Sequence, residues 1–380
     1  MHVVRILTRP NVGGPMTQAV PLWHAMRALG AGTLLITGRC QKDEAPFDVA
    51  SSGIPILTPD SIKANSEGLL LLPELSNHLP WLGDQRIKRQ LTELLAVSQP
   101  DVVHTHTSKA GWLGRQAAFS ARVPVVAHTF HGHVLRDYFG PIRSHLLANL
   151  ERRLARRTNL LFTISDSCAT ELSELGIADH KRFHVVPPAV RSWPSVDRAV
   201  ARQQLGVVDD QFLVACIGRL VPIKRVDHFA EAVQIAPWLF GHVFGDGPDA
   251  PRLQRHYRDL RRLTFHGVNH SVRSLLPAFD ALVLTSIREG LPLVAVEAFE
   301  AKVPVVGYDV PGVCDVLAAG CGVLVPEQQG PKGLVAALQR LRADSILHSQ
   351  CITNGLAGRA RCLPENVASI LLATYQAARG

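Results

Sequence analysis

The sequence lacks any apolar run long enough to cross a membrane, and it lacks the cysteine spacing of a disulfide framework. Its longest apolar runs, such as residues 69–72 and 281–284, fall far short of the ~18–20 residues that span a bilayer. Residues 1–7 lead directly into a polar turn, so no secretory signal is expected. The seven cysteines are scattered and contain no Cys-x-x-Cys pair. These absences argue against a membrane-spanning or disulfide-stapled protein, and we expect a cytoplasmic one.

Two short motifs are missing as well. The dinucleotide-binding fingerprint Gly-x-Gly-x-x-Gly does not follow the first expected strand, because residues 9–15 read Arg-Pro-Asn-Val-Gly-Gly-Pro. A nicotinamide-dependent dehydrogenase is therefore disfavoured. No two aspartates stand at Asp-x-Asp spacing anywhere in the chain, so this way of holding a divalent metal is absent. We expect neither a metal ion nor another cofactor.

The chain is basic, with a net charge of +8, which suits a nucleic acid, a membrane surface or an anionic substrate as partner. Basic residues are shared evenly between the two halves, so no nucleic-acid partner is expected. The densest basic segment is residues 136–157, where arginines interleave with leucines and aromatic residues. This segment indicates either peripheral contact with the inner face of a membrane or a solvated helix packed by its leucines. In the first case Trp81, Lys88 and Arg89 would extend the membrane-facing surface.

Short β-branched or leucine-rich runs alternate with helical patterns along the chain, which predicts an α/β fold of doubly wound parallel sheets. The expected strands are residues 3–7, 34–37, 102–104, 125–128, 160–164 and 184–186 in the first half, and 212–217, 239–244, 263–266, 281–285, 303–307 and 322–325 in the second.

A proline-rich stretch, residues 187–194, separates the two series of strands, and a helical pattern follows it at 198–205. We therefore expect two domains, residues 1–190 and 191–362, and a C-terminal helix within residues 363–380. Ligands of such folds bind at the carboxyl ends of the strands and in the cleft between units.

Two loops at strand ends carry candidate anion ligands. Gly13 and Gly14 stand between the first strand and its helix, where they would either accept an anion at the helix N-terminus or form an ordinary tight turn. Arg219 and Lys224 follow Gly218 in the loop after the first strand of the second half. Two cations at this place would neutralise a diphosphate as it leaves, although a solvated pair is the alternative.

Two glutamates follow a later strand of the second half. Glu289 closes a loop, and Glu297 is expected about two turns into the following helix, so that both can face one cleft. The turn at residues 290–293 would leave backbone amides free for phosphate and sugar oxygens. Their spacing alone is a weak signal, since isolated glutamates usually lie on the surface.

Together these segments resemble family 4 of the retaining glycosyltransferases. Over nearly the whole chain the family's order and spacing are matched by Gly13-Gly14, residues 104–111, residues 131–133, Gly218-Arg219 with Lys224, residues 245–247, and Glu289 with Glu297. The resemblance implies the GT-B fold, in which two Rossmann-like domains bind the acceptor (residues 1–190) and the nucleotide-sugar donor (residues 191–362). It also implies that the C-terminal helix crosses back onto the first domain.

The resemblance further implies individual roles. Arg219 and Lys224 would hold the donor diphosphate, Glu289 and His131 would contact the transferring sugar, and these four would form the catalytic set. Glu297 would bind the ribose. The other donor-binding positions implied are Gly13, Gly14, Gly218, Gly245, Val268, Gly290, Leu291, Leu293 and Val294. His106 and Lys109 would lie on the acceptor side.

The expected reaction moves a hexose or N-acetylhexosamine from a UDP-type donor to a hydroxyl of a glycan, lipid-linked or small glycoside acceptor. Arg219 and Lys224 would replace a divalent cation, and the acceptor would attack the same face that the diphosphate leaves. Polysaccharide or glycoconjugate synthesis would be the setting. A sugar-nucleotide epimerase and a non-enzymatic sugar-nucleotide-binding module remain alternatives with the same architecture.

Two departures and one competing interpretation accompany this resemblance. Pro187-Pro188-Ala189 replaces the usual Asn-Gly-Val hinge, and Pro15 replaces a small flexible residue after the two glycines. The histidines near the ends of two neighbouring strands would suit a transition metal, but no zinc framework accompanies them. We expect them to line the sugar and acceptor side instead; they are His104, His106, His128, His131 and His133.

Overall fold

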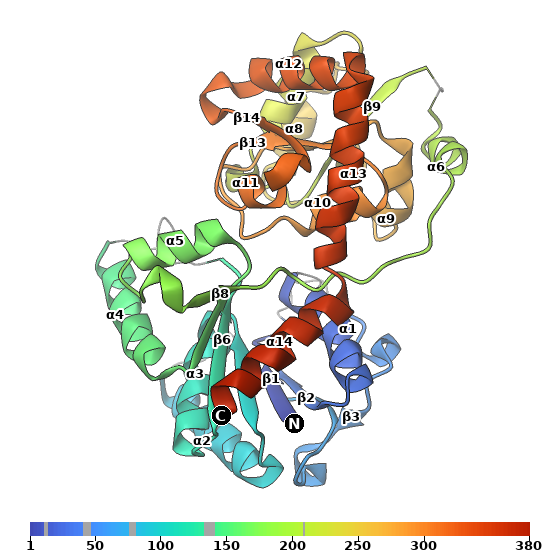
Figure 1. The fold of residues 1–380 in the computed structure, drawn as a ribbon. Helices are drawn as coiled ribbons and strands as arrows, with labels where there is room; N and C mark the ends of the chain where they lie inside the picture. Colours follow the sequence, from blue (N-terminus) through green and yellow to red (C-terminus); the bar gives the residue numbers. More distant parts are fainter. Residues whose placement is uncertain (11–13, 41–46, 76–80, 133–140, 208–209) are drawn as a thin grey trace. The chain divides into compact units, whose positions relative to one another are not determined.

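The computed structural model describes the chain except residues 11–13, 41–46, 76–80, 133–140 and 208–209 (Figure 1). The chain forms two compact units. The first unit contains residues 1–191 and 363–380, and the second contains residues 192–362. Each unit is described by itself below.

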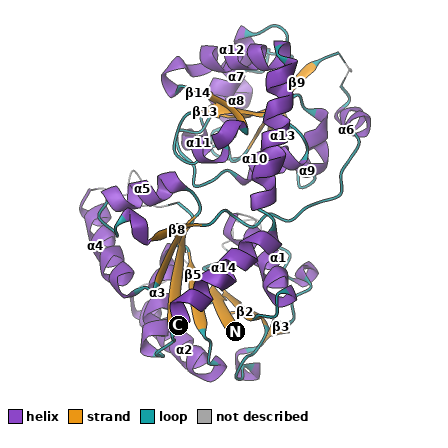
Figure 2. Ribbon diagram, in the orientation of Figure 1, coloured by secondary structure: helices purple, strands orange, loops and turns teal. Residues whose placement is uncertain are grey.

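The first unit is built on an eight-stranded parallel sheet with the order β3-β4-β2-β1-β5-β6-β7-β8 (Figure 2). Its strands are β1 (His2–Ile6), β2 (Gly32–Thr37), β3 (Ile56–Leu57), β4 (Gly68–Leu71), β5 (Val102–His106), β6 (Val125–Phe130), β7 (Leu160–Thr163) and β8 (Phe183–Val185). The strand order reverses between β1 and β5. Such a reversal separates the loops at the carboxyl ends of the two strands and leaves room for a ligand.

Both faces of this sheet are covered by helices. They are α1 (Gly14–Ala28), α2 (Trp81–Ser98), α3 (Ser108–Ser120), α4 (Pro141–Arg157), α5 (Asp166–Glu174) and α14 (Pro364–Arg379). Alternate residues of a strand point to opposite faces. Val4 and Ile6 accordingly join the core under α2 and α3, whereas Val3 joins the core under α1 and α14. Arg5 shares the face of Val3, which places its charge beneath α1 and α14.

The C-terminal helix α14 belongs to the first unit. Its apolar stripe, which includes Val367, Leu371 and Tyr375, packs into the same core as Val3 and Val102. The hydroxyl of Tyr375 also lies 2.5 Å from Nδ1 of His104 on β5. Arg379 at the end of α14 also forms an ion pair of 2.9 Å with Asp101, the residue before β5. Burial of the apolar stripe and these polar contacts fasten α14 to the first unit.

The second unit has a six-stranded parallel sheet with the order β11-β10-β9-β12-β13-β14, which reverses between β9 and β12. Its strands are β9 (Phe212–Ile217), β10 (Leu239–Phe244), β11 (Leu263–Phe265), β12 (Ala281–Leu284), β13 (Val305–Tyr308) and β14 (Gly322–Val325). Its helices are α6 (Arg198–Leu205), α7 (Val226–Ile235), α8 (Ala250–His256), α9 (Val272–Leu275), α10 (Leu293–Glu300), α11 (Val313–Val316), α12 (Gly330–Ala343) and α13 (Ser345–Arg361).

The expected fold class is confirmed, because both sheets are parallel and Rossmann-like. Each expected strand overlaps an observed one, but β3 and β4 were not predicted. β3 has only two residues, and Ile56 is more than half exposed, so neither length nor alternation marks it as a strand. Among the described helices, none is both long enough and apolar enough to cross a membrane.

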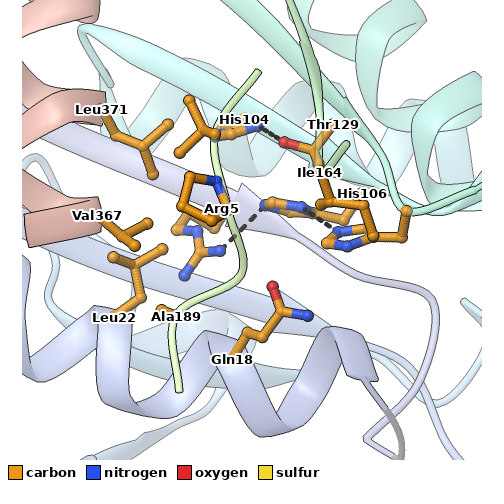
Figure 3. A pocket seen from close by; sticks show the side chains of 13 residues that line it. Arg5, Gln18, Leu22, His104, His106, Thr129, Ile164, Ala189, Val367 and Leu371 are labelled. Atoms are coloured by element: carbon orange, nitrogen blue, oxygen red, sulfur yellow. Dashed lines mark hydrogen bonds between the residues drawn. The ribbon is translucent and has the colours of Figure 1, made fainter. Parts of the chain in front are cut away.

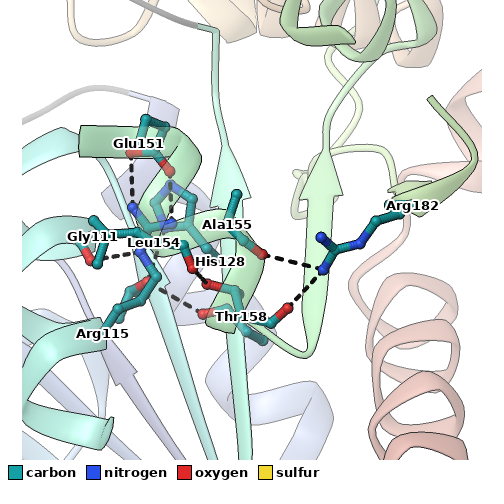
Figure 4. Close-up of polar contacts among 10 residues, drawn as sticks. Gly111, Arg115, His128, Glu151, Leu154, Ala155, Thr158 and Arg182 are labelled. Carbon is teal, nitrogen blue, oxygen red and sulfur yellow. Dashed lines mark hydrogen bonds and ion pairs between the residues drawn. The ribbon is translucent and has the colours of Figure 1, made fainter. Parts of the chain in front are cut away.

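The first unit contains a buried ion pair between α3 and α4 (Figure 4). The guanidinium of Arg115 is fully buried and makes two hydrogen bonds of 2.6 and 2.8 Å to the carboxylate of Glu151. Its Nε donates to the carbonyl of Gly111 at 2.8 Å. Removing one partner of such a pair leaves an uncompensated buried charge, which costs far more than losing a surface pair.

We predict that Glu151→Ala lowers the free energy of unfolding by about 3–5 kcal/mol, because the buried Arg115 would lose its carboxylate partner and both hydrogen bonds to it. The matched control is Glu93→Ala, which removes the exposed pair of Arg89 and Glu93 on α2 and should cost about 0.3–0.5 kcal/mol. Urea unfolding of both variants measures the difference. Equal losses in the two variants would contradict this account of the buried pair.

Candidate active site

In the second unit β9 and β10 are paired neighbours, and the loops after their carboxyl ends are in close backbone contact. The amide of Gly218 donates to the carbonyl of Phe244, and that of Gly245 donates to the carbonyl of Gly267. Gly245 has a φ of 132°, and a Cβ there would lie 1.9 Å from the carbonyl oxygen of Gly218. The structure thus gives Gly245 a steric role, since only glycine lets these two loops approach so closely.

The loop after β9 presents the two predicted cations differently. Arg219 is exposed, whereas Lys224 is largely buried and forms an ion pair with Glu289. The hydroxyl of Ser286 also donates to Glu289, at 2.5 Å. The hydroxyl of Thr285 donates to the carbonyl of Lys224 at 2.7 Å, which joins the loops after β9 and β12. The structure therefore brings Lys224 and Glu289 together.

Gly312 holds the backbone of Glu289 in place and was not singled out from the sequence. Its φ is 80°, and a Cβ there would lie 2.4 Å from the carbonyl oxygen of Glu289. The amide of Glu289 donates to the carbonyl of Pro311, the residue before Gly312, at 2.9 Å. Nothing in the local sequence pairs residues 311–312 with Glu289, because the contact joins loops after two different strands.

Glu297 lies on α10, close to where this helix begins. The helix starts at Leu293, after Pro292, so Glu297 lies little more than one turn into it and not the expected two. Pro292 explains the later start, because a proline favours an extended residue before it and stands at a helix boundary. Glu297 is therefore nearer than expected to the amide groups at the N-terminus of the helix.

The carboxylate of Glu297 is nearly buried and is paired with a cation that the sequence analysis missed. Nε and Nη2 of Arg273 lie 2.8 and 2.6 Å from its Oε1. Burial raises the pKa of Glu297, and Arg273 opposes that rise. The guanidinium of Arg273 also lies 5.5 Å from the ring centre of Trp193. Arg273 is 24 residues from Glu297, so no local motif could have indicated it.

Backbone amides gather at the start of α10. Within the described residues, those of Gly290, Leu291, Leu293 and Val294 donate to no acceptor. Free amides and the positive end of a helix dipole attract an anion. Val268, the expected base-recognition position, is 62% exposed after β11. At the carboxyl edge of its sheet the second unit thus presents free amides, the exposed side chains of Arg219 and Val268, and two ion pairs, Lys224 with Glu289 and Arg273 with Glu297.

In the first unit, side chains converge where β1 and β5 diverge (Figure 3). Nη2 of Arg5 lies 3.2 Å from Nε2 of His106, and Nδ1 of His106 lies 2.9 Å from Nε2 of His131. His104 is held separately by Thr129, 2.7 Å from its Nε2. Gly14 begins α1, while Gly13 and His133 lie outside the described residues.

His104 and His106 are buried and His131 is partly buried, and all three lie near the buried cation of Arg5, so their neutral forms are favoured. Burial is the main cause that lowers the pKa of His131 to about 4, and Arg5 lowers it further. Burial likewise lowers the pKa values of His104 and His106 well below the usual range. No group of three or more histidine, cysteine or acidic side chains within the described residues could hold a metal ion.

Lys109 lies on the opposite face of the first sheet from this histidine cluster, on α3. Its ammonium is nearly buried and lies 2.9 Å from Oδ1 of Asp84 on α2. The pair fastens α2 to α3. Its expected place on the acceptor side stays a prediction, and the observed contact gives Lys109 a structural partner.

Two family models match the chain. Residues 13–189 match the glycosyl transferase 4-like domain, and residues 197–357 match the glycosyl transferases group 1. A galactosyltransferase of Escherichia coli, named for UDP-Gal and GlcNAc-diphosphoundecaprenol, is 29% identical over 76% of this chain and 77% of its own length. A D-inositol 3-phosphate glycosyltransferase of Mycobacterium bovis is 30% identical over 75% of this chain and 64% of its own length.

Solved structures show the same fold. The Anabaena protein HepE, crystallised with UDP and glucose, superposes with a TM-score of 0.77 at 19% identity and covers 99% of this chain and 100% of its own. The sucrose-phosphate synthase of Thermosynechococcus elongatus gives a TM-score of 0.79 at 19% identity, over 99% and 98% of the two chains. With both of its halves matched by glycosyltransferase models, the chain belongs to glycosyltransferase family 4.

Proposed function

We propose that the chain is a retaining, metal-independent glycosyltransferase that moves a hexose or N-acetylhexosamine from a UDP-sugar to a hydroxyl of a glycan, lipid-linked or small glycoside acceptor. The observation that carries the proposal is the cluster at the carboxyl edge of the second sheet. There Arg219, the pair of Lys224 and Glu289, and the free amides of α10 lie on loops next to the reversal in strand order.

Charge neutralisation is the chemistry this cluster supplies. When the bond between sugar and diphosphate breaks, negative charge grows on the leaving oxygen, and fixed cations and amides stabilise it without a metal. Lys224 forms an ion pair with Glu289. The ammonium that would contact the diphosphate and the carboxylate that would contact the sugar therefore lie next to each other before the donor binds. Both contacts of Arg273 fall on Oε1 of Glu297, which leaves Oε2 for a ribose hydroxyl.

The relatives support the choice of donor and acceptor. The Escherichia coli relative is named for a UDP-sugar donor and a lipid-diphosphate acceptor, and the Mycobacterium bovis relative for a phosphorylated cyclitol. HepE of Anabaena was also crystallised with UDP-glucose. A UDP-sugar and an acceptor that bears a phosphate are therefore the first substrates to test.

Removal of either cation should lower activity, and removal of Arg219 should do so without a loss of stability. We predict that Arg219→Ala and Lys224→Ala each lower kcat/KM by roughly 10²–10³, the range for losing one group that stabilises transition-state charge. Arg219→Ala should leave the melting temperature unchanged, because this side chain is exposed and makes no ion pair with any described residue. Initial rates with a UDP-sugar and a panel of phosphorylated acceptors measure the effect. Arg258→Ala, which removes an exposed arginine of the same unit, is the control and should keep full activity.

Metal independence and stereochemistry can be tested in one assay. We predict that turnover of an α-linked UDP-sugar is unchanged in excess EDTA and that the new glycosidic bond is α, because the cations of the chain replace the metal and attack occurs on the departing face. Proton NMR of the purified product gives the anomeric configuration. Loss of turnover in EDTA would contradict metal independence, and a β-linked product would contradict the retaining mechanism.

Peripheral membrane contact is a separate part of the proposal, supported by α4. Leu146 is 63% exposed, and Arg153 and Arg156 are exposed on the same helix. Arg152, by contrast, donates to the carbonyl of Leu175 and so fastens α4 to the end of α5.

We predict that Arg153→Glu with Arg156→Glu abolishes sedimentation with anionic liposomes, because basic side chains near an apolar one favour an anionic surface. The matched variant Arg258→Glu changes the charge of the second unit and should sediment like the native protein. If the double variant sediments as well as the native protein, α4 does not dock on membranes.

A further inference from the structure

A cavity of about 30 Å³ lies in the first unit at the point where β1 and β5 diverge (Figure 3). Side chains of the sheet form one wall, and residues of α1, α14 and the segment 186–189 form the other. Arg5, Gln18 and His131 are among its polar lining residues. His131 is expected to contact the transferring sugar, but the residues proposed to hold the donor diphosphate and ribose belong to the second unit, so the buried Arg5 of this cavity needs an explanation of its own.

The guanidinium of Arg5 is buried without a countercharge. Its side chain is 3% exposed, and no carboxylate among the described residues pairs with it. Within the described part of the chain, its hydrogen-bond partners are the carbonyl of Ala19, at 3.3 Å, and His106. Burial lowers the pKa of Arg5 to about 10, with only the phenol of Tyr375 opposing the shift. Arg5 is therefore still charged at neutral pH, and a buried unpaired cation is costly unless an anion accompanies it.

The hydrogen bonds from Arg5 run in one direction. An arginine can only donate, so Nε2 of His106 accepts and the proton of neutral His106 is on Nδ1. That Nδ1–H donates to Nε2 of His131, which places the proton of neutral His131 on its own Nδ1. Nδ1 of His131 is buried and has no partner among the described residues, and the same holds for Nε of Arg5. The chain of donors thus ends on a buried N–H without an acceptor.

We propose that this cavity is a subsite for an anionic oxygen group, of the phosphate type, carried by the acceptor substrate. A phosphate oxygen supplies both things that the surroundings lack, a negative charge for Arg5 and an acceptor for Nδ1–H of His131. Arg5 then has two tasks: it attracts the anion, and through His106 it fixes the tautomer in which His131 can donate. The assignment to the acceptor rests on the proposed function, in which the diphosphate of the donor occupies the second unit.

Ligand-induced shifts in melting temperature test the subsite, because a ligand that binds only the native state stabilises it. The probes are inorganic phosphate, N-acetylglucosamine 1-phosphate, N-acetylglucosamine and UDP. The variants are Arg5→Met, which keeps the side chain long but uncharged, and the pair Arg219→Ala with Lys224→Ala, which removes the proposed donor diphosphate site.

In the native protein both phosphates should raise the melting temperature, the sugar phosphate should bind more tightly, and the unphosphorylated sugar should have no effect. Arg5→Met should lower the affinity for inorganic phosphate and for the sugar phosphate by at least about tenfold, which is the loss expected for one charged hydrogen bond. It should keep the shift with UDP. The donor-site pair should lose the shift with UDP and keep the shifts with both phosphates.

The outcomes separate the two proposals. Equal phosphate shifts in the native protein and Arg5→Met would overturn the subsite while leaving the donor site untouched. Absence of a shift with UDP in the native protein would count against the proposed function and not against the subsite. If inorganic phosphate binds as tightly as the sugar phosphate, the assignment to the acceptor is wrong.

A second measurement needs no change at Arg5. In ¹⁵N-labelled native protein, histidine NMR should show His131, assigned with His131→Gln, as the Nδ1–H tautomer, and its Nδ1 resonance should move when inorganic phosphate is added. The other tautomer, or a resonance that phosphate leaves unchanged, would contradict the proposal even if Arg5→Met failed to fold.

Discussion

The pairing of parallel strands is the constraint on which the rest of this structure depends. Because neighbouring strands run the same way, their carboxyl ends meet at one edge of each sheet, and a reversal in strand order separates the loops there. In the first unit the reversal between β1 and β5 places Arg5 beside His106. In the second unit the reversal between β9 and β12 lets Lys224 meet Glu289, 65 residues away in sequence.

Electrostatics then decide what each edge can do. The second unit pairs two cations of its candidate site with nearly buried carboxylates: Lys224 with Glu289, and Arg273 with Glu297. It leaves Arg219 exposed and four amides without an acceptor among the described residues, so an incoming anion meets donors that are already in position. The first unit does the opposite with Arg5, whose charge is buried and whose partners in the described part of the chain are neutral. Both edges favour negative oxygen ligands, by different means.

The sequence predicted the architecture, and it singled out Lys224 and Glu289, which the structure brings into contact. What it predicted and what it missed differ for a physical reason. Alternating strand and helix patterns, the prolines of 187–194 and the periodicity of the last helix are local signals, and the corresponding elements are present. The short edge strand β3, Arg273 opposite Glu297, and Gly312 behind Glu289 depend on contacts between distant segments, which a local pattern cannot encode. The predicted start of α10 was too early because the tendency of a proline such as Pro292 to stand at a helix boundary was not taken into account. The role of Arg5 was missed for a similar reason, since one charge in an apolar strand becomes informative only when its surroundings are known.

The most direct test of the central claim is a crystal structure of the chain with a UDP-sugar bound. We expect the diphosphate oxygens to lie within hydrogen-bonding distance of Arg219, Lys224 and the amides at the start of α10. A ribose hydroxyl should contact Glu297, and no metal ion should bind the diphosphate. A nucleotide bound in the first unit, or a diphosphate held by a divalent cation away from Arg219 and Lys224, would contradict it.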